Sequence, residues 1–179
     1  MSQYLVLCAL GSDRPGLVKD LTDFLADRGG NVDDSRMAIL GAEFGIMVLI
    51  SGEESAIHRI EREIPDVEKM TGTRIMLKRT KSPEEHRKGE LRGFSVIVES
   101  FDREGIVKAV AAALHGLGAN IVSLETTQWD APFTGATLFR IEVHAEVPKT
   151  TSLVKVRSVL DEVGARENLE IDVRTLTAS

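Results

Sequence analysis

The chain has 179 residues and a formal net charge of −6 at pH 7, with 28 acidic against 22 basic side chains. This balance argues against a general nucleic-acid surface, which is basic, and an aromatic share of 4% argues against a stacking platform for single strands. The single cysteine, Cys8, excludes an intramolecular disulfide and a cysteine-based zinc cluster. No run of 18 apolar residues occurs, so we expect a cytoplasmic protein with no membrane partner.

The first half of the chain predicts the order strand, helix, strand, strand, helix, strand. Apolar residues at helical spacing predict the inner face of the first helix, and a Gly-Ala pair predicts the turn of the hairpin. Ser12 or Asp13 is predicted to cap the first helix, and Pro15 suits its first turn. The predicted elements are a strand over 4–10, a helix between Pro15 and Gly29, strands over 31–40 and 43–51, a helix over 53–70 broken or kinked at Pro65, and a strand over 73–79.

The second half predicts the same order. The predicted elements are a strand over 94–100, a helix whose inner face runs from residue 106 to residue 114, strands over 121–127 and 137–146, a helix over 152–166 and a strand over 169–176. Between the halves, a stretch rich in charge, Pro, Gly and Ser has no apolar period. We therefore predict two domains, residues 1–80 and 93–179, joined by a linker over 81–92.

An internal duplication relates the two halves. Residues at Asp13, Arg14, Gly16, Gly29 and Asn31 recur 89 positions later as Asp102, Arg103, Gly105, Gly118 and Asn120. After the next strand the offset becomes 94, since Gly41 matches Gly135, which predicts five extra residues within 128–132. The repeated order is the split βαβ, or ferredoxin-like, pattern, so the predicted fold class is α+β with two βαββαβ domains in tandem.

The strands of the first copy are apolar on both faces. Leu5, Leu7 and Ala9 would lie on one face, and Val6 and Cys8 on the other. A sheet covered by helices on one side only is expected to be polar on its open side. We therefore expect the first sheet to pack against another sheet or subunit, and the protein to form a homo-oligomer.

The junction between first strand and first helix carries the sharpest local signal, S-D-R-P-G-L-V in one copy and F-D-R-E-G-I-V in the other. A helix N-terminus offers backbone N–H groups and partial positive charge to a carboxylate or phosphate. Arg14 and Arg103 could hold an anion or lie solvated, and the amides of Asn31 and Asn120 could bind an amino acid or form turns. In the alternative, structural interpretation, the aspartate caps the helix, the proline starts it and the glycine packs.

No catalytic constellation is found. The four histidines are scattered, with no metal-ligand spacing, and no nucleophile elbow is present. An acylphosphatase-like enzyme would combine this fold with one arginine and one asparagine, but the first strand is not followed by a glycine-rich phosphate loop. We predict a protein that is not an enzyme and needs neither metal nor cofactor.

Both copies resemble ACT domains, through G-S-D-R-P-G-L-V with G-G-N-V and through F-D-R-E-G-I-V with G-A-N-I. The pair resembles the glycine cleavage system transcriptional repressor family. The resemblance implies ligand loops over 13–17 and 102–106, with the asparagines opposite, at interfaces between ACT domains. The second copy departs by Glu104 in place of Pro15. The implied ligand-binding residues are Asp13, Arg14, Pro15, Gly16, Leu17, Asn31, Asp102, Arg103, Gly105, Ile106 and Asn120.

This resemblance implies a non-enzymatic regulator that binds a small amino acid, for which glycine or serine is expected. Such repressors act on a protein partner such as a DNA-binding activator, and the net charge of −6 agrees with the absence of direct nucleic-acid binding. The alternative is an ACT pair without a ligand, which serves only for dimerisation or docking.

Overall fold

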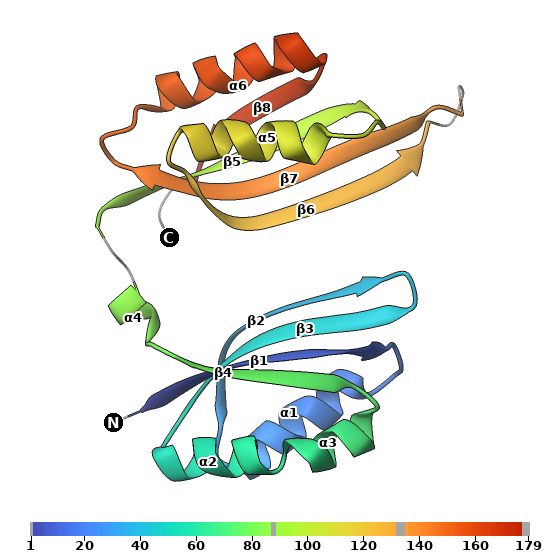
Figure 1. Cartoon of the computed structure of the whole chain (residues 1–179), viewed down its shortest axis with the longest axis vertical. Helices are drawn as coiled ribbons and strands as arrows, with labels where there is room; N and C mark the ends of the chain where they lie inside the picture. Colours follow the sequence, from blue (N-terminus) through green and yellow to red (C-terminus); the bar gives the residue numbers. More distant parts are fainter. Residues whose placement is uncertain (1, 87–88, 132–134, 177–179) are drawn as a thin grey trace. The chain divides into compact units, whose positions relative to one another are not determined.

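The chain folds into two compact units, Met1–Lys88 and Gly89–Ser179 (Figure 1). The computed structural model describes residues 2–86, 89–131 and 135–176. Each unit is a four-stranded antiparallel sheet with helices on one of its faces. The two therefore confirm the predicted α+β class and the tandem βαββαβ, ferredoxin-like pattern.

The first unit has strand order β2-β3-β1-β4, and its helices α1, α2 and α3 lie on one side of the sheet (Figure 1). The sequence break predicted at Pro65 divides the second helix in two, with the division at Glu63 and the proline in the first turn of α3. The elements are β1 Gln3–Ser12, α1 Leu17–Asp27, β2 Asn31–Leu40, β3 Glu43–Gly52, α2 Glu54–Arg62, α3 Ile64–Thr71 and β4 Arg74–Thr80.

The second unit repeats this order as β6-β7-β5-β8, with α5 and α6 on one face. The segment predicted as a linker contains the four-residue helix α4 Pro83–His86, and β5 begins inside it at Leu91. The elements of the second unit are β5 Leu91–Phe101, α5 Ile106–Gly116, β6 Asn120–Asp130, β7 Thr137–Pro148, α6 Leu153–Glu167 and β8 Glu170–Thr175.

Strand register corrects the length and position of the predicted insertion. Leu5 pairs with Ile50, and its equivalent Phe94 pairs with Ala145. Ala145 follows Ile50 by 95 positions, whereas Phe94 follows Leu5 by 89, so the second copy has six extra residues and not five. The matched pairs Leu40 with Glu43 and Trp129 with Leu138 place all six after Trp129, within 130–137. Residues 132–134 of that segment, and with them Pro132 of the predicted insertion, lie outside the described residues.

The core of each unit lies between its sheet and its helices. Inward side chains of the strands meet the apolar faces of the helices, as Leu5 and Leu7 do with Leu21 in the first unit. Phe94 and Val96 occupy the matching places against Val110 in the second. Alternation along the strands and helical spacing in the helices converge on one apolar layer, which explains why the two copies share a fold.

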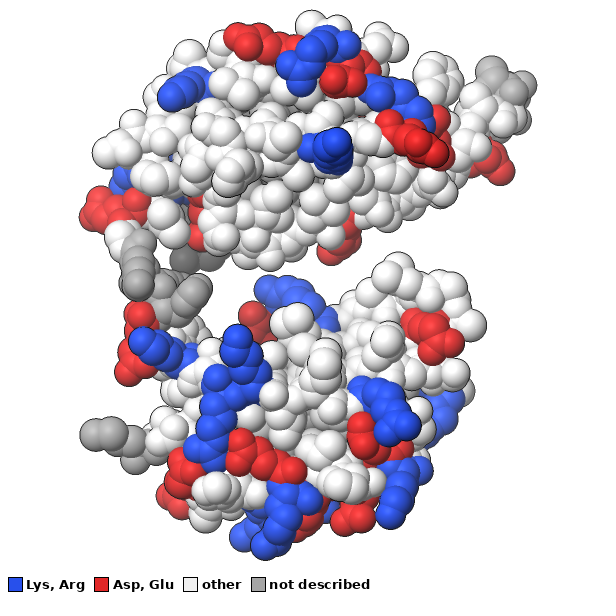
Figure 2. Space-filling model, viewed as in Figure 1, with Lys and Arg blue, Asp and Glu red and all other residues white. Residues whose placement is uncertain are grey.

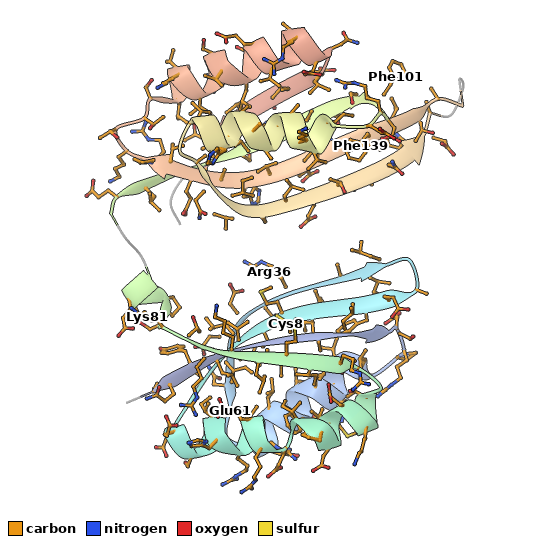
Figure 3. The ribbon with its side chains drawn as sticks, viewed as in Figure 1. Cys8, Arg36, Glu61, Lys81, Phe101 and Phe139 are labelled. Atoms are coloured by element: carbon orange, nitrogen blue, oxygen red, sulfur yellow. The ribbon has the colours of Figure 1, made fainter. Side chains whose placement is uncertain are left out.

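The opposite face of the first sheet carries apolar side chains, for which we predict cover by another sheet or subunit. Cys8 lies on the central strand β1, paired in register with Met47 on β3 and Met76 on β4 (Figure 3). Met47 is 55% exposed and Met76 73% exposed. Cover of this face by another sheet or subunit stays a prediction. Among the described residues, no helix is long and apolar enough to cross a bilayer.

Candidate functional site

The strand–helix junction of each unit turns on a glycine in the left-handed conformation. Gly16 has φ 84° and Gly105 has φ 90°, and each is the N-cap residue of its helix, α1 or α5. An N-cap is ordinarily extended and accepts the helix N–H groups with its own side chain. The prediction that Ser12 or Asp13 caps α1 is wrong, because no side chain of the described residues caps that helix. Pro15 lies before the helix and not in its first turn.

The same backbone bond fixes both junctions to the neighbouring hairpin. The Asp13 amide donates to the Ala42 carbonyl over 3.0 Å, and the Asp102 amide donates to the Thr137 carbonyl over 2.9 Å. The side chains differ, since the Asp102 carboxylate accepts from the Gln128 amide over 2.9 Å. The chain therefore reverses at a fixed point in each unit before the helix begins.

No side chain caps the first turn of α1 or α5, and the N-cap glycines Gly16 and Gly105 are exposed. At α1 the Leu17 amide donates to the Arg14 carbonyl over 3.4 Å. Helix α6, by contrast, is capped by Ser152, whose hydroxyl accepts from the Lys155 amide over 3.2 Å. Helices α2 and α3 also lack a side-chain cap, so the left-handed glycine is what sets the two junctions apart. A helix N-terminus without a side-chain cap can bind an anion such as an amino-acid carboxylate.

The two junctions carry their acidic charge at different positions. The first turn of α1 contains Asp20, whereas the first turn of α5 contains no acidic residue. A carboxylate in the first turn lowers the attraction of the helix terminus for an anion. The second junction has Glu104 in its loop where the first has Pro15, so each junction carries one such carboxylate, at a different position.

Both junction arginines are engaged inside their own unit, which the sequence analysis did not predict. Arg14 donates to the Asp20 carboxylate over 2.7 Å and to the Met70 carbonyl over 3.4 Å. Arg103 donates to the Glu167 carbonyl over 2.6 Å and to its carboxylate over 3.1 Å. In each unit the arginine thus connects the junction to the last turn of the helix that precedes the fourth strand, α3 in the first unit and α6 in the second. No periodic signal links positions so far apart in sequence, so these partners could not be found from spacing.

The carboxylate that binds Arg103 has a perturbed acidity. Hydrogen bonds from Arg166 and then Arg103 hold the pKa of Glu167 below its usual range. The group therefore stays ionised at neutral pH and keeps its attraction for the guanidinium groups. Arg103 is positioned by this contact and not by solvent.

The predicted asparagines lie at the far end of the sheet from the junction of their own unit. Asn31 pairs with Ser51, whereas Ser12, next to the junction, pairs with Glu43. The eight intervening steps along β3 span about 26 Å. Asn120 and the second junction are separated in the same way along β7. One unit alone therefore does not bring the loop and the asparagine together.

The side chain of Asn31 is bonded to a carboxylate of its own strand. The Asn31 amide donates to Asp33 over 2.6 Å, and the Ser51 hydroxyl donates to the same carboxylate over 2.8 Å.

The described residues hold no group of three or more His, Cys, Asp or Glu side chains that could bind a metal ion. Basic and acidic side chains are interspersed over the face of the first unit shown in Figure 2. That face offers no continuous basic surface for a nucleic acid.

Comparison with known proteins agrees with this architecture. Residues 3–78 match the family model of the ACT domain. The glycine cleavage system transcriptional repressor of Escherichia coli (strain K12) is 28% identical over 172 residues, covering 94% of this chain and 90% of the relative.

Two solved structures are similar over nearly the whole chain. An unknown protein from Galdieria sulphuraria is 34% identical, with a TM-score of 0.81 and coverage of 99% of this chain and 100% of that one. A structure described as a putative glycine cleavage system transcriptional repressor is 27% identical, with a TM-score of 0.74 and coverage of 99% of both chains. The likeness therefore extends through both units.

Proposed function

We propose that this chain, whose first unit matches the ACT-domain family model and which is similar over both units to glycine cleavage system transcriptional repressors, is a non-enzymatic regulator that binds a small amino acid. The amino acid proposed is glycine or serine. Its binding would alter the affinity of the chain for a protein partner such as a DNA-binding activator, and so regulate transcription.

The observation that carries this proposal is the repeated junction with its left-handed glycine. Gly16 and Gly105 adopt the same conformation, and a Cβ added at either would meet no atom within 4 Å. The glycine is thus required by the backbone turn and not by packing inside the unit. A turn of this kind leaves space beside the first N–H groups of the helix for a ligand carboxylate.

Each predicted residue has a role in this proposal. Backbone N–H groups within the loops 13–17 and 102–106 bind the carboxylate, except that Pro15 has none and the Asp13 and Asp102 amides already donate to the hairpins. Arg14 and Arg103 hold these loops in place. The amides of Asn31 and Asn120 bind the ligand from a second ACT unit, since within one unit they lie at the wrong end of the sheet. The proposed site therefore forms at an interface between ACT domains, which links ligand binding to assembly.

Control through a protein partner fits the charge of the chain. A net charge of −6 opposes association with nucleic acid at long range. The apolar open face of the first sheet, with Met47 and Met76 exposed, is a surface on which a protein could dock. The same surface would serve the alternative function, a docking module without a ligand.

Isothermal titration of the intact protein against glycine, serine and the other amino acids tests the proposal. Binding of a small amino acid is expected, and Asn31→Ala and Asn120→Ala are each expected to weaken it at least about tenfold. Thr127→Ala, an exposed change on β6, is the matched control and should leave affinity unchanged.

Two results would contradict the proposal. Absence of binding to any amino acid at about 10 mM would remove the ligand-sensing role. Capture of the same partner protein with equal affinity in the presence and absence of amino acids would favour the docking module instead.

A further inference from the structure

A cavity of about 520 Å³ lies at one corner of the second unit, where β5 ends. It is separate from the proposed amino-acid loop of residues 102–106, none of which lines it. Its size is within the range of small-molecule sites. The lining residues are Glu99, Ser100, Phe101, Trp129, Leu138, Asn168, Leu169 and Glu170.

Two carboxylates face each other at this cavity. Glu99 on β5 pairs in register with Glu170 on β8, and like charges directly opposite each other destabilise a sheet. Glu99 accepts a bond from Arg140 over 2.5 Å, but Arg140 is also bound to Glu142 over 2.7 Å. Glu170 forms no ion pair in the described part of the chain. The cavity thus keeps an uncompensated negative charge that a cation would neutralise.

Aromatic side chains supply the rest of a cation site. Phe101, at the end of β5 (Figure 3), is 65% exposed, and Trp129 is 38% exposed. Exposed rings of this size beside a carboxylate bind organic cations through the negative potential of their faces. Leu138 and Leu169 offer apolar contact for an alkyl chain.

The backbone at the cavity is unusual as well. Asn168 has φ 51°, the one positive φ of a non-glycine residue among those described. The equivalent helix-end position of the first unit is Gly72, with φ 74°. Glycine adopts this conformation without strain, whereas asparagine does so at some cost. The second unit therefore keeps an amide side chain where the fold alone favours glycine.

The first unit has none of this chemistry at the same corner. At the positions equivalent to Glu99 and Glu170, the first unit has Leu10 and Arg74, which pair with each other in the same way. The structural equivalents of Phe101 and Trp129 are Ser12 and Leu40. Since the two units share one fold, these differences are not required by folding, and the charge at the corner is reversed from Arg74 to Glu170.

We propose that this corner of the second unit binds a small organic cation, an alkylammonium or alkylguanidinium ion. The charged head lies between the carboxylates of Glu99 and Glu170, and the alkyl chain runs over Phe101 and Leu138 toward Trp129 on the opposite edge strand. The head group can belong to a free ion or to a Lys or Arg side chain of another protein. The site is distinct from the proposed amino-acid site, because it offers carboxylates and no helix N-terminus to its ligand.

Trp129 is the single tryptophan of the chain, so its emission reports on this cavity directly. The full-length protein is titrated with agmatine, which has a guanidinium and an ammonium group but no carboxylate, and with uncharged butylurea as the control ligand. Agmatine is expected to change the Trp129 emission saturably, and butylurea is not. Isothermal titration checks the affinity without relying on the fluorophore.

Three variants distinguish binding at this cavity from a general attraction of the cation to the negative charge of the protein. Glu170→Gln is expected to weaken agmatine binding at least about tenfold, and Asn168→Gly to weaken it while keeping the fold, as Gly72 does in the first unit. Glu125→Gln removes an exposed carboxylate from the same sheet without touching the cavity and should change affinity less than about twofold.

A blocked Ala-Arg-Ala peptide distinguishes the source of the cation. Tighter binding of the peptide than of agmatine identifies a protein side chain, and the reverse order identifies a free ion, and either result supports the site. No binding of agmatine or peptide at about 10 mM would overturn the proposal, as would equal losses in Glu125→Gln and Glu170→Gln. Binding of glycine and serine is measured in separate titrations. Absence of binding at the proposed amino-acid site therefore does not affect the test of the cation site.

Discussion

Gly16 and Gly105 occupy the same place in their units and have φ values of 84° and 90°. Because no atom lies within 4 Å of a Cβ added at either, substitution acts only through the backbone. We expect Gly16→Ala and Gly105→Ala each to lower the free energy of unfolding of their unit by about 1 kcal/mol. Urea denaturation measures the change. Asparagine, which tolerates this conformation better, should recover part of the loss, and an alanine variant as stable as the wild type would contradict the assigned turn.

The contact of Arg103 with Glu167 predicts a role in stability and not in direct ligand binding. Arg103→Gln removes the donor to the last turn of α6, so a fall of a few degrees in Tm is expected, and amino-acid affinity should fall with it because the loop is no longer held. Calorimetry and titration measure the two effects. Arg174→Gln is the control, since its partner Asp172 lies two residues away on the same strand. A large loss of affinity at unchanged Tm would instead make Arg103 a ligand-binding residue.

The ion pair of Glu61 with Arg79 predicts a pH-dependent contribution to the first unit. Arg79 donates to the two carboxylate oxygens of Glu61 over 2.8 and 2.9 Å and to Glu54 over 2.7 Å. These hydrogen bonds hold the pKa of Glu61 below its ordinary value. A carboxyl with a lowered folded-state pKa stabilises the fold above its unfolded pKa, and the contribution is lost as pH falls through the folded pKa.

Arg79→Gln should therefore lower Tm at pH 7 and have a progressively smaller effect as the solution is acidified below about pH 4. Thermal unfolding monitored by circular dichroism over this pH range checks the convergence. A Tm difference that stays constant down to pH 2 would show that Glu61 is not the titrating partner.

Cys8 reports on the open face of the first sheet, because it is the one cysteine of the chain and lies between Met47 and Met76. If a sheet or subunit covers this face, the thiol will react slowly with a thiol reagent such as Ellman's reagent, and mild denaturation will speed the reaction. Met76→Glu, which introduces a charge into the face, should weaken the cover and raise the rate. Immediate reaction in the folded protein would mean that this face is open to solvent.

Most of the fold could be predicted from the sequence because each element has a local cause. The hairpin strands 31–40 and 43–51 are predicted within one residue of β2 and β3, because a Gly-Ala pair marks the turn between them. The duplication repeats the same order of strands and helices, so each half supports the elements predicted for the other. These signals depend on near neighbours in sequence and need no knowledge of tertiary contacts.

The details that were missed depend on contacts between distant residues. The cap predicted at Asp13 was wrong because a left-handed Gly16 starts the helix, and a glycine in sequence does not reveal its φ. The insertion was one residue too short because matching Gly41 to Gly135 follows turn glycines, while the true register is set by strand pairing. The cross-strand pair of Glu99 and Glu170 becomes visible only when β5 and β8 are placed side by side.

The single tyrosine, Tyr4, lies in the first unit, and the single tryptophan, Trp129, lies in the second. Selective excitation of the tryptophan therefore follows the unfolding of one half of the intact chain. Tyrosine emission, which lies at shorter wavelength than tryptophan emission, follows the other half. A ligand that binds only the folded form raises the midpoint of the half that binds it. Two optical transitions in a single melting experiment would thus assign each small molecule to its half of the protein without cutting the chain.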